Sequence, residues 1–262
     1  MNTVAFPGLN LELNIQKVAF GIFGIEIYWY AILIVVAIIL ALILYKKRDG
    51  LYDIKYNDIL DLCLYLIPIS IICARLYYMA FNLQYYMQFP KQILNLRSGG
   101  LAIYGAVIGG GITCFIFCRK RKINILDLLD YIVPGLVLGQ AIGRWGNFIN
   151  IEAYGSQTNS ILRMGITEAG KYIEVHPTFL YESIVCFTVF IFLLLIKNKR
   201  IFKGQILFTY LILYSFQRFF VEGLRTDSLK VGNIKVSQMV SVIIFVSGLV
   251  MYILKHKKIR GE

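Results

Sequence analysis

Histidine, cysteine and acidic residues are all scarce in this chain of 262 residues. Only two histidines are present, which argues against a zinc or haem site built on imidazole. The five cysteines lie inside or at the ends of apolar segments, a pattern typical of small core residues rather than of a disulfide framework. We therefore expect no bound metal.

Charged residues are also too few for a soluble globular domain. They make up 16% of the chain, against 58% hydrophobic residues, and the mean hydropathy is +0.67. These values predict an integral membrane protein, an all-α helical bundle that forms one domain over residues 1–262. The polar segment 144–176 would form a small extracytoplasmic cap. Residues 1–26 lack the features of a signal peptide, so we expect them to be retained.

The charge that is present has mostly one sign, because 27 Lys and Arg residues outnumber 15 Asp and Glu, for a net charge of +12. Such an excess is compatible with nucleic acid binding, but the basic residues stand in short clusters between apolar runs rather than on one polar face. Anionic membrane lipid is the better partner, and we expect no nucleic acid.

Seven apolar segments are long enough to cross a membrane as helices, which takes about 20 residues. The fourth segment has the weakest signal, because Asp127 and Asp130 lie near its start and Pro134 disfavours a helix. The seven segments are 27–45, 59–81, 101–118, 126–143, 178–196, 204–221 and 237–254.

Basic clusters follow the first, third, fifth and seventh segments, at residues 46–48, 119–122, 197–203 and 255–260. The positive-inside rule places these clusters in the cytoplasm, so the N-terminus faces out and the C-terminus faces in. The fourth and sixth segments then run outward. We expect Arg144 and Arg225, near the outer ends of these two segments, to converge on the outer face.

The segment 143–155 puts polar side chains directly after an apolar run, where charge is costly unless it meets a partner. A guanidinium group can hold a phosphate through two parallel hydrogen bonds, so Arg144 and Arg225 are candidates for phosphate binding. Alternatively, each pairs with a nearby carboxylate, Glu152 or Asp227, or reaches the lipid head groups.

Other polar residues leave more than one interpretation open. Asn147 and Asn150 would share one face of a helix and could grip backbone or ligand oxygens. Arg75 in the second segment either pairs with a carboxylate or lines the site. Arg218 contacts helix carbonyls or a carboxylate such as Glu222, and His176 could accept a proton or cap the fifth segment.

The third segment is rich in glycine, and the spacing of Gly105 and Gly109 favours close packing against another helix. Tyr104 is the exception in this segment, because its hydroxyl group lies among residues too small to cover it.

Gly143-Arg-Trp-Gly-Asn-Phe-Ile-Asn-Ile-Glu-Ala-Tyr-Gly155 closely resembles the signature of the bacterial prolipoprotein diacylglyceryl transferases. The supporting segments are 29–30, 74–76, 99–105, 176–182, 221–227 and 236–238, in the order of the family. The resemblance implies a multi-pass enzyme of the bacterial cytoplasmic membrane, with its active site towards the outer leaflet and no cofactor. Its substrates would be phosphatidylglycerol and a prelipoprotein signal peptide with a lipobox cysteine. The cysteine thiol would receive the diacylglyceryl group, and glycerol 1-phosphate would be released.

The resemblance also implies roles for individual residues. Arg144 and Arg225 would bind the lipid phosphate, and we group Asn150 and Arg75 with them as substrate-binding residues. Tyr104 stands where some members have a histidine that has been considered as the base. Because a phenol is a weak base near neutral pH, the proton acceptor stays open between Tyr104, His176 and Glu152. The remaining implied positions are Asn147, Gly155, Tyr30 and Glu152, with Tyr30 and Glu152 in the catalytic group.

A lipid or anion transporter is the alternative function, with the outer arginines as a binding vestibule. It would need a site of matching chemistry on the inner face, and the cytoplasmic loops are short and simply basic.

Overall fold

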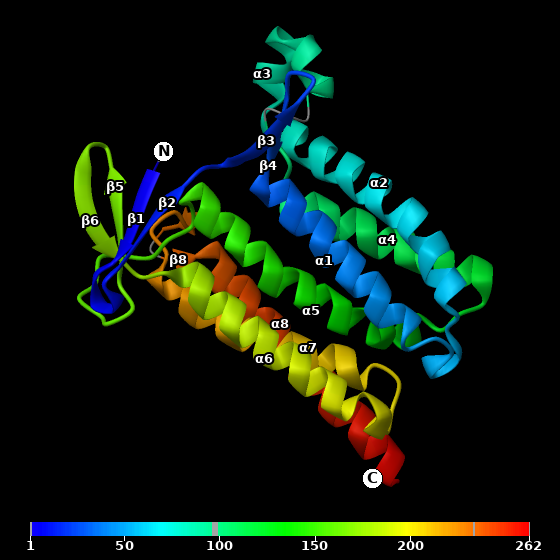
Figure 1. The fold of residues 1–262 in the computed structure, drawn as a ribbon. Helices are drawn as coiled ribbons and strands as arrows, with labels where there is room; N and C mark the ends of the chain where they lie inside the picture. Colours follow the sequence, from blue (N-terminus) through cyan, green and yellow to red (C-terminus); the bar gives the residue numbers. More distant parts are fainter. Residues whose placement is uncertain (1, 96–98, 233, 262) are drawn as a thin grey trace. The chain divides into compact units, whose positions relative to one another are not determined.

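The computed structural model describes residues 2–95, 99–232 and 234–261 (Figure 1). By its internal contacts the chain divides into two compact units, one of Met1–Leu44 with Ile132–Glu262 and one of Tyr45–Tyr131. The division falls within a long helix, α5 (Ile125–Asn150). A single domain over residues 1–262 stays a prediction, and residues 1 and 262 lie outside the described part.

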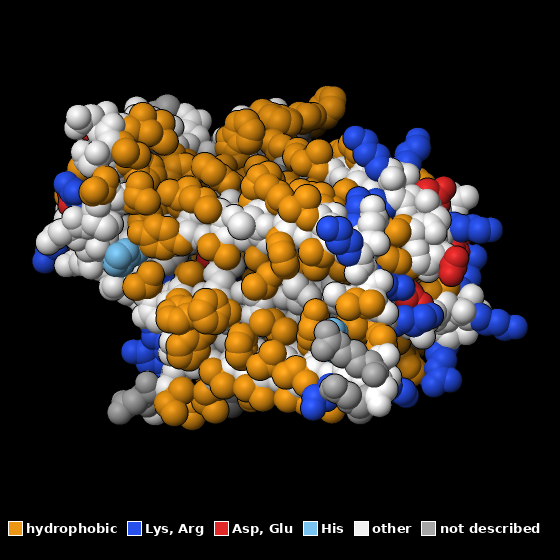
Figure 2. Space-filling model, turned by 90° about the horizontal axis from the view of Figure 1, so that it is seen from below, with side chains coloured by type: hydrophobic (Ala, Val, Ile, Leu, Met, Phe, Trp, Pro, Cys, Tyr) orange, Lys and Arg blue, Asp and Glu red, His pale blue; other side chains and the backbone are white. Residues whose placement is uncertain are grey.

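Six helices in the described part of the chain are long and apolar enough to cross a membrane. In lipid, a helix satisfies every backbone N–H and C=O within one segment, which is why apolar runs of this length become helices. Apolar side chains accordingly cover much of the face shown in Figure 2. The six helices are α1 (Trp29–Lys46), α2 (Tyr56–Phe81), α4 (Ile103–Arg121), α5, α6 (Thr178–Ile196) and α8 (Val236–Arg260).

The seventh predicted segment, 204–221, forms the helix α7 (Gln205–Leu224), but α7 is not among these six. Polar side chains, among them Gln217, Arg218 and Glu222, interrupt its apolar run. The membrane character of the protein is therefore supported, and a crossing by α7 stays a prediction. Shorter helices are α3 (Leu83–Gln88) and the 3₁₀ turns Pro7–Leu9, Leu51–Asp53, Pro90–Leu94 and Lys197–Lys199.

The prediction that the fourth segment ends at residue 143 and gives way to a loop is wrong. Helix α5 continues to Asn150, and Pro134 lies inside it. The side chains of Asn147 and Asn150, in the last turn of α5, both donate hydrogen bonds to Glu152 just beyond the helix end. These bonds satisfy the amide groups without ending the helix early.

The protein is mostly helical, but the prediction of an all-α fold is wrong, because eight strands accompany the helices within the residues that the structure describes. Four of them form one antiparallel sheet in the order β2-β1-β5-β6. Each strand spans only five residues, and only β2, Leu-Glu-Leu-Asn-Ile, alternates strictly between apolar and polar residues, so long apolar runs in the sequence do not reveal them. The strands of the sheet are β1 (Asn2–Phe6), β2 (Leu11–Ile15), β5 (Met164–Glu168) and β6 (Lys171–Val175).

Two separate hairpins complete the strands. They are β3 (Val18–Ile22) with β4 (Ile25–Tyr28), and β7 (Lys230–Val231) with β8 (Ile234–Lys235). The first leads directly into α1 and the second into α8.

Two apolar clusters lie in the first unit and hold the sheet and the helices α5, α6 and α7 together. The cluster under the sheet contains Val4, Phe6, Phe148, Met164, Ile166, Val175 and Phe179. The cluster between the helices contains Val133, Val137, Ala141, Cys186, Val189, Leu193, Ile206 and Tyr210.

In the second unit, α2 packs along α4, and the glycines of α4 make this approach possible. A Cβ added at Gly109 would lie 2.6 Å from both Cβ and Sγ of Cys73. One added at Gly105 would lie 2.6 Å from Cβ of Tyr77. The predicted role of these glycines in close helix packing is confirmed.

Gly109→Ala should destabilise the protein, although alanine is the better helix former. The added methyl group overlaps Cys73, and overpacking of this kind costs about 1–3 kcal/mol. Gly111→Ala is the matched control, because nothing lies within 4 Å of a Cβ added there. Thermal unfolding in detergent measures both variants, and equal melting temperatures for the two would contradict the packing argument.

Candidate active site

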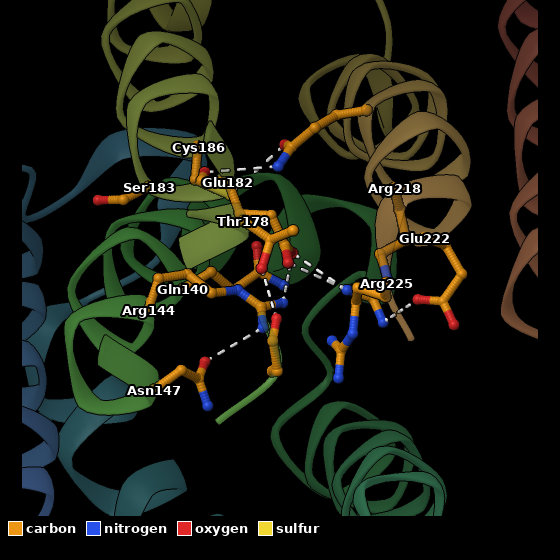
Figure 3. A network of polar contacts seen from close by, with 12 residues as sticks. Gln140, Arg144, Asn147, Thr178, Glu182, Ser183, Cys186, Arg218, Glu222 and Arg225 are labelled. Carbon is orange, nitrogen blue, oxygen red and sulfur yellow. Dashed lines mark hydrogen bonds and ion pairs between the residues drawn. The ribbon is translucent and has the colours of Figure 1, made fainter. Parts of the chain in front are cut away.

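A buried carboxylate, Glu182 of α6, lies between arginines of two other helices (Figure 3). Its side chain is 1% exposed, and its Oε2 lies 2.6 Å from Nη2 of Arg144 on α5. Nη1 of Arg218 on α7 donates to both of its carboxylate oxygens, at 3.2 and 3.1 Å. Burial of a charge is tolerated when it is paired in this way, so Glu182 ties α5, α6 and α7 together.

Arg218 carries a second ion pair, with Nη2 at 2.6 Å from Oε2 of the buried Glu222 one turn further along α7. The predicted contact between Arg218 and Glu222 is confirmed. Arg218 therefore belongs to the same network as Arg144, a position that sequence reasoning did not give it.

Arg144 is also held from the end of its own helix. Its Nη1 donates to Oδ1 of Asn147 at 3.3 Å, and Nδ2 of Asn147 donates to Glu152 at 2.8 Å. Asn150 donates to the same oxygen of Glu152 at 3.4 Å, so the two asparagines share a helix face as predicted. The alternative that Arg144 pairs with Glu152 is wrong, because its carboxylate partner is Glu182 and it reaches Glu152 only through Asn147.

Arg225 directly follows the last residue of α7 and binds Asp227 through two hydrogen bonds, from Nε at 3.0 Å and Nη2 at 2.8 Å. The alternative pairing of Arg225 with Asp227 is confirmed. Burial by itself would lower the pKa of Arg225. The hydrogen bonds to Asp227 and the negative charges of Asp227, Glu222 and Glu182 have the opposite and larger effect, so the pKa of Arg225 is raised above its usual value. The hydrogen bond from Arg225 lowers the pKa of Asp227. Figure 3 shows Arg225 beside the network of Arg144, Glu182 and Arg218.

The backbone around Arg225 is fixed from two directions. Gly155 and Arg225 form an antiparallel bridge, and the N–H group of Ser156 donates to the carbonyl of Leu224 at 2.8 Å. Nζ of Lys235 donates to the carbonyls of Glu222, Gly223 and Arg225, at 2.7, 3.0 and 2.6 Å. A cation at the C-terminal end of a helix also complements the helix dipole. The sequence did not indicate a role for Lys235, because a lysine close to the end of a predicted helix is only a weak sign of a capping contact.

Two glycines bring predicted site residues into contact with the network. A Cβ at Gly146 would overlap the ring of Tyr30, so glycine lets this ring lie directly against α5. A Cβ at Gly155 would lie 2.7 Å from Cβ of His176, and the N–H group of Gly155 donates to the carbonyl of His176 at 2.9 Å. Nδ1 of His176 lies 3.2 Å from the hydroxyl of Tyr181, which fixes the imidazole at the start of α6.

Arg75 lies in the second unit, and its guanidinium group donates to five backbone carbonyls. The distances are 2.5 Å to Gln92, 3.1 Å to Ile93, 3.1 Å to Asn95, 2.7 Å to Gly99 and 3.0 Å to Gly100. In the described part of the chain Arg75 forms no ion pair, so the alternative of a carboxylate partner is wrong. These contacts close the segment after α3 onto α2, and a substrate-binding role for Arg75 stays a prediction.

Tyr104 also lies in the second unit, in the first turn of α4. Its side chain is 43% exposed, in agreement with the expectation that small neighbours leave it uncovered. Its ring centroid is 6.4 Å from that of Tyr77 on α2.

The chemistry of the network suits an anion. The guanidinium groups of Arg144 and Arg218 pair with Glu182, Arg225 lies beside them in Figure 3, and the amide of Asn147 contacts Arg144. Arginine binds phosphate through forked hydrogen bonds. Among the described residues, no group of three or more His, Cys, Asp or Glu side chains is placed to hold a metal ion. Sequence reasoning missed Glu182 as the centre. The sequence feature that could have identified Glu182 is the presence of an acidic residue within an apolar run.

Comparisons with known proteins agree with this chemistry. A family model described as prolipoprotein diacylglyceryl transferase matches residues 17–254. A phosphatidylglycerol–prolipoprotein diacylglyceryl transferase of Finegoldia magna is 48% identical over 244 residues, covering 93% of this chain and 96% of the relative. Proteins of the same name from Clostridioides difficile and Bacillus cytotoxicus are 46% and 41% identical, each over 93% of this chain and over 96% and 93% of their own lengths. The chain belongs to the prolipoprotein diacylglyceryl transferase family.

Proposed function

We propose that this protein transfers the diacylglyceryl group of phosphatidylglycerol to the thiol of the lipobox cysteine in a prelipoprotein signal peptide. The products are a thioether-linked lipoprotein precursor and glycerol 1-phosphate. The observation that supports this function best is that Arg144, near the end of α5, and Arg225, directly after α7, both lie at the polar network around the buried carboxylate of Glu182 (Figure 3).

The two arginines bind the phosphate of the lipid in this proposal. Glu182 holds Arg144 in one orientation before substrate arrives, so little reorganisation is needed on binding. Asp227 holds Arg225 in the same way, and at 50% side-chain exposure it is placed where an arriving phosphate could displace it. Asn147 and Asn150 extend the same surface with amide groups that can donate to lipid oxygens.

The reaction breaks one C–O bond and forms one C–S bond. The thiolate attacks the glyceryl carbon next to the phosphate ester oxygen, the electron pair of the C–O bond goes to that oxygen, and the thiol proton leaves to an acceptor. The phosphodiester begins with about one negative charge and leaves with nearly two, so arginines at the phosphate stabilise the transition state more than the bound substrate.

The proton needs an acceptor, but not a strong one. A free cysteine has a pKa near 8.5, and positive potential from the arginines increases its thiolate fraction. His176, Glu152 and Tyr104 are the candidates, and Tyr30 places its ring beside the helix that carries Arg144. His176 has the further advantage of a fixed imidazole, because Tyr181 holds it.

For the membrane arrangement we propose seven crossings, with the N-terminus outside, the C-terminus in the cytoplasm and the site towards the outer leaflet of the bacterial cytoplasmic membrane. The supporting features are the basic clusters after α1, α4, α6 and α8. Helix α7 supplies the remaining crossing. Its Gln217 and Glu222 are buried, and Arg218 is paired with carboxylates rather than turned towards lipid.

Arg144→Ala should lower the rate of transfer about a hundredfold, because one contact to the developing phosphate charge is worth roughly 3 kcal/mol. The measurement is transfer of labelled diacylglyceryl from phosphatidylglycerol to a lipobox peptide in detergent. Arg163→Ala is the control, because Arg163 pairs with Glu174 on the sheet, at 2.5 Å, away from the network. Near wild-type turnover of the Arg144 variant would remove the phosphate-binding role.

Glu182→Gln should lower both the melting temperature and the rate. The amide has the shape of the carboxylate but cannot neutralise two guanidinium groups, and breaking a buried pair costs about 3–5 kcal/mol. Glu174→Gln is the control, because its ion pair with Arg163 is partly exposed and is worth far less. Equal melting temperatures for the two variants would show that Glu182 does not anchor the network.

A further inference from the structure

The hairpin β3–β4 ends in an apolar turn that nothing in the described chain covers. Phe23 is 100% exposed, and its neighbours Ile22 and Ile25 are 49% and 46% exposed. Phe20, further down the same hairpin, is 49% exposed. Single exposed apolar residues are common, but four on one short hairpin form a surface that water solvates poorly.

The backbone of this turn is also unsuited to phenylalanine. Phe23 and Gly24 both have positive φ angles, 49° and 77°. A two-residue hairpin turn of this kind favours asparagine or aspartate before the glycine, and a bulky residue at positive φ is strained. In a turn that faced water, asparagine would relieve the backbone strain and would also be better solvated than phenylalanine. The phenyl ring is therefore placed here against local preference, which points to a partner that accepts it.

The charges of the hairpin lie below its tip. Lys17 precedes β3, and Glu26 pairs with Gly21, one pair below Ile22 and Ile25. Glu26 accepts a hydrogen bond from the hydroxyl of Tyr28 at 3.0 Å, so its carboxylate is directed towards the base of the hairpin. Residues 22–25, beyond Glu26, carry no charge. This order, with an apolar tip, a carboxylate below it, and Tyr28 and Lys17 at the base, follows the gradient from hydrocarbon to head groups.

The base of the hairpin is joined to a helix whose apolar surface is mostly exposed. The N–H group of Trp29, the first residue of α1, donates to the carbonyl of Lys17 at 3.1 Å. Only 11% of the apolar window of α1 is buried, so its exposed apolar surface continues into the hairpin. Figure 1 shows the hairpin at the start of α1, apart from the four-stranded sheet.

We propose that the hairpin β3–β4 inserts its tip into the acyl layer of the leaflet in which α1 begins, so that its partner is lipid hydrocarbon. Phe23 and the two isoleucines enter the acyl chains, and Lys17 and Glu26 stay at the head groups. This inference stands on the exposure and backbone of the hairpin and does not depend on the proposed transfer reaction.

Phe23→Trp tests the insertion by fluorescence, because tryptophan is also aromatic and the site is exposed. The variant is reconstituted in phosphatidylcholine and phosphatidylglycerol vesicles, with or without bromine on the acyl chains, and the signal of the unsubstituted protein is subtracted to remove Trp29 and Trp145. Tyr172→Trp is the matched control, an exposed aromatic position on β6 of the sheet.

The expected result is loss of the added Phe23→Trp emission with brominated acyl chains, and protection from aqueous iodide. The Tyr172→Trp control should show the reverse. Quenching of the Phe23 variant by iodide alone would place the tip in water and overturn the proposal. Quenching by neither agent would show that protein covers the tip, from a second copy or a peptide partner, and would overturn it equally.

Discussion

The carboxylate of Glu182 is the interaction on which the candidate site depends. Without it, the guanidinium group of Arg144 would lose its carboxylate partner, Arg218 would keep only Glu222, and α5 and α7 would lose their common anchor on α6. The ion pairs are short, and the carboxylate is almost completely buried, so the dielectric around it is low and the geometry is fixed. A site that binds a lipid phosphate benefits from this arrangement, because the positive groups are oriented before the ligand arrives.

A second constraint fixes the chain where α7 ends. The bridge between Gly155 and Arg225 joins the segment after α5 to the segment after α7, and Lys235 holds the last carbonyls of α7. The four-stranded sheet continues from the same place, since the backbone of His176 at the end of β6 bonds to Gly155. The sheet is thus connected through its own backbone to the residues that carry the positive charge.

Arginine serves two different purposes in this protein, and their surroundings distinguish them. Arg144 and Arg225 meet side-chain carboxylates and amides that a charged ligand could replace. Arg75 donates to five backbone carbonyls, which cannot move away without undoing the loop, and lies over the ring of Tyr86. From sequence, each is simply an arginine in or beside an apolar run, because a local pattern does not show which partner an arginine takes.

The sequence by itself determined the membrane character, the positions of the helices and the family, because an apolar run in lipid has no alternative to the helix and the segment 143–155 is continuous in the chain. It also indicated Arg144, Asn147, Asn150 and Arg225 as a polar group. Only the tertiary structure decided that Glu182 is the partner of Arg144, that Arg218 shares it, and that residues 2–15 and 164–175 build one sheet. These pairings join residues that are distant in sequence, so helix packing and strand register set them rather than any local pattern.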